Sequence, residues 1–184
     1  MIEIGGRRLG EADVTELLTT DHPMVERFRL EVDGGDVGQS LHFALVIEAR
    51  RGVRYLQQRG TRGERVAPVW RTLDGGEAIG QGNRALWVEG DELAAENQTF
   101  FPDQRFNDLG IGSAMYVAQE RLYRALGVRR VTLLAVAVGT YTWARQGFAF
   151  EDPATAGRLV PRLEQFLFGH GLPLTGVDAA ALRE

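Results

Sequence analysis

The stretch Arg105-Phe106-Asn107-Asp108-Leu109-Gly110-Ile111-Gly112-Ser113-Ala114 leads from an apolar, strand-like segment, Thr99-Phe100-Phe101, into an amphipathic helix. Two glycines one residue apart at such a junction expose backbone N–H groups, because no side chain covers them. The N-terminus of a helix also carries about half a positive charge. The turn is therefore a candidate site for a phosphate or pyrophosphate group, although glycines at strand-to-helix turns also serve tight packing.

The residues after this turn predict a helix and then a buried strand. Gly127 stands where a left-handed C-terminal cap would end the helix. The apolar run that ends at Val138 is typical of a strand buried on both faces. Apolar side chains recur along the helix at spacings of three and four, at Met115, Ala118, Leu122, Ala125 and Leu126. From about residue 92 to 150 we expect strand, glycine turn, helix, strand, short helix, Gly-Phe and strand.

This order resembles the GNAT superfamily of acyl-coenzyme A-dependent N-acetyltransferases, over about 60 of the 184 residues. In that family a turn of the form Gln or Arg-x-x-Gly-x-Gly or Ala holds the coenzyme A pyrophosphate with backbone amides. The matching stretch here runs from Asn107 to Gly112, and Gly147-Phe148 is similar to the family's Leu-Gly-Phe step. The resemblance implies transfer of an acetyl group from acetyl-coenzyme A, as co-substrate, to an amine by direct attack.

The resemblance also implies roles for individual residues. Phe100 and Phe101 lie where the family supplies a backbone N–H to the oxyanion, and a bulge there would open the sheet. Glu96 is the expected base, because some members place a Glu fourteen residues before the first turn glycine. The implied coenzyme-binding residues are Phe100, Phe101, Arg105, Asn107, Asp108, Leu109, Gly110, Ile111, Gly112 and Ser113.

The acid that protonates the departing thiolate departs from the family pattern. Trp143 stands where the family often has Tyr, and an indole N–H cannot serve as an acid. Tyr141 is the expected substitute. Asn107 replaces the family's Gln or Arg, and the Asn that commonly follows the preceding strand is missing. Two alternatives therefore stay open: a non-catalytic GNAT-like module that binds a ligand or a protein, and a component of a larger assembly.

Composition excludes several other classes of function. The chain has no Cys, so disulfides and thiolate catalysis are excluded, and no spacing of residues suggests a metal site. A net charge of −4 argues against a nucleic-acid partner. No apolar run is long enough for a signal peptide or a membrane span. We expect a cytoplasmic protein acting on a small-molecule or peptide amine, with no membrane partner and with its oligomeric state open, a homodimer included.

The expected fold class is α/β (α+β), with a GNAT-like mixed, mostly antiparallel central sheet and flanking helices. We expect one domain over 1–184: a β-rich N-terminal half (1–90), a coenzyme-binding core (91–150), and a C-terminal helix and tail (151–184). No confident amphipathic helix precedes residue 110. Gly80-Gln81-Gly82 predicts a turn.

Between Glu48 and Arg71 the chain is strongly basic, with seven Arg against two Glu. This segment is either a surface for anionic groups, such as an acidic substrate or the coenzyme phosphates, or a solvated loop and strand edge.

Overall fold

The computed structural model describes residues 1–33, 39–57, 69–106, 109–134, 148–149 and 152–169. The chain divides into two units, Met1–Leu133 and Leu134–Glu184. The expectation of a single domain over 1–184 stays a prediction.

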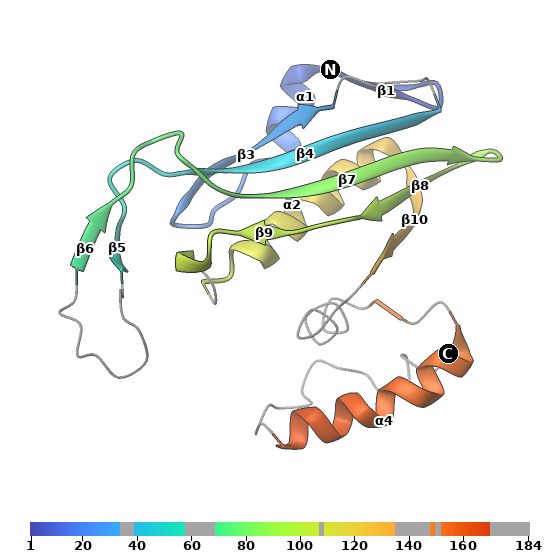
Figure 1. Cartoon of the computed structure of the whole chain (residues 1–184). Coiled ribbons are helices and arrows are strands. Elements are labelled where there is room, and N and C mark those ends of the chain that lie inside the picture. The colour runs from blue at the N-terminus through green and yellow to red at the C-terminus, as the bar shows by residue number, and fades with distance from the viewer. Residues whose placement is uncertain (34–38, 58–68, 107–108, 135–147, 150–151, 170–184) are drawn as a thin grey trace. The chain divides into compact units, whose positions relative to one another are not determined.

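A mixed sheet forms the centre of the first unit (Figure 1), with the strand order β10-β8-β7-β4-β3. Its strands are β3 (Val25–Val32), β4 (Ser40–Ala49), β7 (Ala78–Glu89), β8 (Glu92–Asn97) and β10 (Val128–Leu133). Only β8 and β10 run parallel; the other neighbours are antiparallel. A short strand, β9 (Phe101–Pro102), continues the line of β8 and also pairs with β7. The predicted mixed, mostly antiparallel sheet with a β-rich N-terminal half is confirmed.

Two hairpins form two-stranded sheets of their own, separate from the central sheet. The first joins β1 (Ile2–Ile4) and β2 (Arg7–Leu9), and its turn glycines both have positive φ angles. The second joins β5 (Arg54–Gln57) and β6 (Val69–Thr72) and projects beyond the end of the sheet in Figure 1. The second hairpin belongs to the Arg-rich segment, whose residues 58–68 lie outside the described part of the chain.

The helices of the first unit are α1 (Glu11–Leu17), a single 3-10 turn η1 (Gln104–Phe106) and α2 (Ile111–Leu126). The predicted helix after the glycine turn is confirmed, and it ends at Gly127 in the left-handed conformation. The sequence shows no confident amphipathic helix before residue 110, but the structure has the short helix α1 there. With seven residues and only Val14 buried, α1 is too short to show a helical period in the sequence. In the second unit, the predicted C-terminal helix is α4 (Pro153–Gly169).

The core lies between α2 and one face of the sheet. On that face, alternate residues of the strands are almost fully buried, among them Leu41, Phe43, Leu45, Ile47, Leu86, Leu93 and Ala95. The matching side chains of α2 are Met115, Ala118, Leu122 and Leu126. Burying one such side chain contributes about 1.5 to 3 kcal/mol. This packing fixes the helix on the sheet, and with it the position of its N-terminus.

Two local expectations are corrected. Gly80-Gln81-Gly82 is not a turn but part of β7. A Cβ on Gly82 would lie 2.8 Å from Nη1 of Arg84 and 3.0 Å from Cε of Met115, so the glycine makes room for side chains under α2. The strand β10 is less buried than expected, since residues 131–133 are half-buried and Leu134 is exposed. In the described part of the chain, β10 has a single strand neighbour, β8.

Candidate functional site

The strand that leads to the glycine turn is interrupted where the sequence predicts a bulge. Arg84 of β7 pairs with Asn97 of β8, and Gln81 pairs with Phe101 of β9. Between these two pairs β7 advances three residues while its partner advances four, so one extra residue is accommodated. The N–H groups of Gln98 and Thr99 both donate to the Asn83 carbonyl. The Phe100 N–H has no backbone acceptor among the described residues.

The pairing of β8 with β10 ends at the same point. Asn97 and Leu133 are the last paired residues of these two parallel strands. Beyond them, β9 pairs with β7 alone within the described part of the chain. Among the described residues, no strand pairs with the edge of β9 that faces away from β7.

The N-terminus of α2 follows this break closely along the chain. Its N-cap is Gly110, and no acidic side chain lies in the first turn. The Ala114 N–H donates to the Gly110 carbonyl at 3.1 Å. The earlier N–H groups, those of Ile111, Gly112 and Ser113, have no partner within the helix, as at any helix start. They form a set of backbone donors at the positive end of the helix dipole.

Each of the two glycines has a structural reason to be glycine. Gly110 has φ +80°, a left-handed backbone conformation that residues other than Gly and Asn rarely adopt. A Cβ on Gly112 would lie 3.1 Å from Cε1 of Phe100, so Gly112 lets this ring pack against the helix start. Ser113 is exposed in the first turn. The side chain of Ile111 is buried in the core, whereas Leu109 is exposed.

Arg105 is bound to neighbours inside the protein. Its guanidinium donates to the Asp103 carboxylate and, at 2.9 Å, to the hydroxyl of Tyr55 on β5. It also lies over the rings of Tyr55 and Phe106. Hydrogen bonding to Asp103 raises the pKa of Arg105, and the same bonds lower the pKa of Asp103. Arg105 thus ties η1 to the β5–β6 hairpin; its predicted contact with a phosphate stays a prediction.

Glu96 and Phe101 share the face of the sheet opposite α2. Glu96 pairs with Ala85 and Phe101 with Gln81, and the side chains of alternate β7 residues point to the same face. Glu96 is half-buried, and its carboxylate accepts a hydrogen bond from Gln98 Nε2 at 3.3 Å. Phe101 is 65% exposed. The candidate base therefore lies two residues before the break, on the side away from the helix.

Some predicted residues fall outside the described part of the chain. These are Asn107 and Asp108 in the turn, and Tyr141 and Trp143 in the segment after β10. Their predicted roles stay predictions.

His22 is a neighbour of the turn that the sequence did not indicate. Its Nε2 lies 2.8 Å from the Leu109 carbonyl, and its Nδ1 accepts the Met24 N–H at 3.3 Å. Because Nδ1 is an acceptor, Nε2 carries the proton and donates a hydrogen bond to the Leu109 carbonyl. The contact joins residues 87 positions apart in the chain, so no local pattern could have revealed it.

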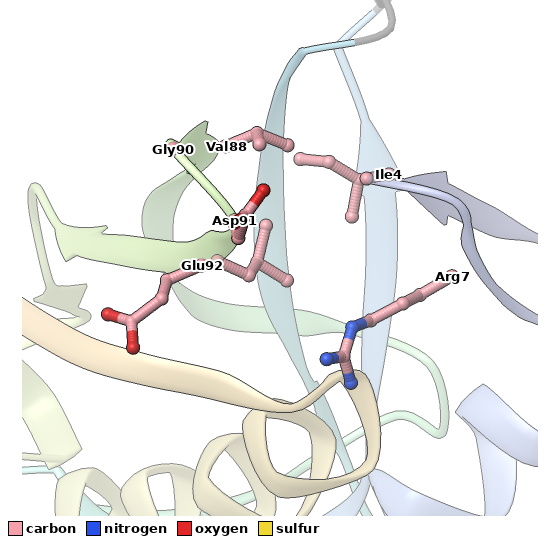
Figure 2. A pocket seen from close by; sticks show the side chains of 8 residues that line it. Ile4, Arg7, Val88, Gly90, Asp91 and Glu92 are labelled. Carbon is pink, nitrogen blue, oxygen red and sulfur yellow. The ribbon is translucent and has the colours of Figure 1, made fainter.

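A separate cavity lies at the other end of α2 (Figure 2). It measures about 290 Å³ and is bounded by the β1–β2 hairpin and the β7–β8 turn, with Ile4, Arg7, Val88 and Asp91 among its lining residues. The Arg7 guanidinium lies against Gly127, the C-cap of α2. A helix of 16 residues is about 24 Å long, so this cavity is remote from the glycine turn.

No group of three or more His, Asp or Glu is arranged to hold a metal ion in the described part of the chain. None of its helices is both long enough and apolar enough to cross a membrane.

Comparison with known proteins adds little to this geometry. Neither a protein-family model nor a curated protein matches the chain. Two solved structures of an aminoglycoside acetyltransferase from an uncultured soil metagenomic sample are similar to part of it. The complex with sisomicin is 20% identical with a TM-score of 0.36, and covers 43% of this chain and 55% of that one. The complex with trehalose is 19% identical with a TM-score of 0.35, and covers 41% and 51%.

The matches thus span about half the length of those acetyltransferase chains. TM-scores and identities this low carry no argument about function.

Proposed function

We propose that the protein is an acyl-coenzyme A-dependent N-acetyltransferase that acts on an amine of a small molecule or peptide. The observation that supports the proposal is the break between β8 and β9, which lies at the end of the β8–β10 pairing and shortly before the N-terminus of α2. Among the described residues, this stretch of chain offers an unpaired strand edge and a set of helix N–H donors.

In this proposal the phosphates of acetyl-coenzyme A bind the first turn of α2. The N–H groups of Ile111, Gly112 and Ser113 would donate to the pyrophosphate, and the helix dipole favours its negative charge. The amide-bearing arm of the co-substrate would lie along the edge of β9 that faces away from β7, where Pro102 offers a carbonyl acceptor but has no N–H to donate. Two contacts would hold the turn in place: Arg105 with Asp103, and His22 with the Leu109 carbonyl.

We further propose the following chemical steps. The amine nitrogen attacks the thioester carbonyl carbon and gives up a proton to Glu96, directly or through a water molecule. The Phe100 N–H would donate to the oxygen that becomes negative. The carbon–sulfur bond then breaks, and the departing thiolate takes a proton from Tyr141. The co-substrate implies action in the cytoplasm, as expected from the sequence.

The test measures ligand binding and turnover with the full chain. Acetyl-coenzyme A at about 100 times its Kd would stabilise the fold by about 2.7 kcal/mol, which raises the Tm by roughly 5 to 10 °C for a chain of this size. Transfer of labelled acetyl groups is then measured on polyamines, aminosugars and dipeptides with free α-amines. A Tm shift without transfer to any of them would favour the non-catalytic module, and no shift at millimolar co-substrate would overturn the proposal.

A further inference from the structure

Arg84 is a buried cation that has no carboxylate partner within the part of the chain that the structure describes. The residue is 1% exposed and lies on β7 directly opposite Asn97, on the face covered by α2. No carboxylate forms an ion pair with it among the residues that the structure describes. Burial lowers its pKa, yet a guanidinium remains protonated at neutral pH. Burying an uncompensated charge costs several kcal/mol, so stability alone does not account for an arginine here.

The neutral partners of Arg84 lie across the strand break. Its Nη1 donates to the carbonyls of Asn83 on β7, at 2.7 Å, and of Thr99 in the break, at 2.8 Å. These carbonyls are already acceptors, since Asn83 N–H donates to Thr99 and the N–H groups of Gln98 and Thr99 donate to Asn83. One guanidinium nitrogen therefore holds both sides of the break in a single geometry.

The other contact of Arg84 reaches the helix. Its Nε donates to Oε1 of Gln119 on α2, and Gln119 Nε2 donates to Oδ1 of Asn97 at 2.9 Å. The Tyr123 hydroxyl donates to the same Asn97 oxygen at 3.0 Å. Gln119 follows Gly112 by seven residues, about 10 Å along the helix. The network thus joins the break in the strand to the helix whose N-terminus follows it in the chain.

The space around this network is filled. A Cβ on Gly82 would lie within 3 Å of both terminal nitrogens of Arg84. Two buried atoms beside the network, Asn97 Nδ2 and Thr99 Oγ1, have no hydrogen-bond partner among the described residues.

We propose that Arg84 is a positioning residue for acyl transfer, which fixes the break at Thr99 and Phe100 relative to the N-terminus of α2. The inference rests on the proposed function. The co-substrate would bind by its phosphates at the helix and react at the break, so the distance between these two points decides whether the thioester carbonyl meets the Phe100 N–H. A displacement of about 1 Å at a reacting group can cost roughly a hundredfold in rate.

The experiment compares Arg84→Met with the wild type. Methionine is apolar and two heavy atoms shorter, so it removes the buried charge and its bonds while keeping most of the packing of the side chain. We expect the Tm to change little, because the cost of burying the charge is removed while Gln119 Oε1 loses its donor. The Kd for acetyl-coenzyme A should change less than about threefold, and kcat with the best amine should fall about a hundredfold. Amide hydrogen exchange of residues 97–101 should become faster. Arg84→Lys, which keeps the charge and one donor nitrogen, should recover part of kcat.

The matched control is Arg130→Met. Arg130 is an exposed arginine of β10 that forms an ion pair with Glu89 at the end of β7. This substitution should change neither kcat nor hydrogen exchange at residues 97–101. Parallel losses of Tm and kcat in Arg84→Met, or an unchanged kcat, would overturn the inference. If the wild type neither binds the co-substrate nor transfers an acetyl group, the proposed function itself has failed, and the wild type alone reveals this.

Discussion

At the scale of single residues, Gly110 shows how backbone conformation decides what a position tolerates. A Cβ on Gly110 would meet nothing within 4 Å, so the constraint is its φ of +80° and not lack of space. Gly110→Ala should lower the stability by about 1 kcal/mol, since the left-handed conformation is costly for alanine. Gly110→Asn should cost less, because asparagine tolerates this region. Thermal unfolding of the two variants measures the difference, and equal Tm values would contradict the strain argument.

Arg105 makes the second prediction at this scale. Because its guanidinium binds Asp103 and Tyr55, Arg105→Met should loosen the β5–β6 hairpin from η1. We expect a loss of about 1 kcal/mol, seen as a Tm lower by roughly 2 to 4 °C. Calorimetry on the same variant tests the coenzyme role. A Kd changed less than about threefold assigns Arg105 to support of the turn, whereas a tenfold loss would show direct contact with a phosphate.

Sequence patterns show the residue types of the candidate site but not their partners. The pair Gly110 and Gly112 indicated a helix start, and α2 begins there. The contacts of Arg105 with Tyr55 and of His22 with Leu109 join segments 50 and 87 residues apart. Such contacts depend on the tertiary fold, so the sequence could place Arg105 near the turn but not show what its guanidinium binds.

At the scale of elements, the strands β3 and β4 carry an ionic ladder on the sheet face opposite α2. Glu48 is buried, and its carboxylate accepts hydrogen bonds from Arg27 and Arg29. Burial alone would raise the pKa of Glu48, but the bonds from the two arginines outweigh it, so the pKa is lowered. A lowered carboxyl pKa stabilises the fold above the unfolded-state pKa, roughly pH 4.3, and this contribution is lost as the pH falls through the folded-state pKa.

Glu48→Gln should therefore lower the free energy of unfolding by about 1 to 2 kcal/mol at pH 7. The loss is smaller than for a fully buried pair, because the side chains of Arg27 and Arg29 are 52% and 41% exposed and can turn to solvent. Urea unfolding from pH 7 down to pH 3 tests the sign. The gap between wild type and variant should narrow below roughly pH 4.3; a gap independent of pH would contradict the assignment.

The length of each element explains which ones the sequence revealed. Helix α2 has 16 residues, enough for its apolar period to repeat several times. Helix α1 has only seven residues, too few for a helical period to be recognised in the sequence. The spacing of Gly80 and Gly82 in β7 is also typical of a turn, so the sequence alone does not distinguish a turn from a strand here. The distinction comes from the packing of Arg84 and Met115 against Gly82. The extra residue between β8 and β9 agrees with the bulge expected near Phe100 and Phe101.

For the protein taken as a whole, the proposed function requires that the start of α2 bind the phosphates of an acyl-coenzyme A. Ser113 offers a direct test, because it is exposed in the first turn of α2, which holds no acidic residue. A carboxylate there is favourable for the helix, by about 0.3 to 1 kcal/mol, but repels a bound phosphate. Ser113→Glu should therefore keep or raise the Tm while it weakens the binding of acetyl-coenzyme A. Ser113→Gln, of the same size and neutral, is the matched control.

The measurement is titration calorimetry of acetyl-coenzyme A into the wild type, Ser113→Glu and Ser113→Gln. We expect stoichiometric binding to the wild type and to Ser113→Gln, and at least a tenfold larger Kd for Ser113→Glu, which corresponds to about 1.4 kcal/mol. Equal Kd values for the three proteins, or no binding to the wild type at millimolar acetyl-coenzyme A, would contradict the claim.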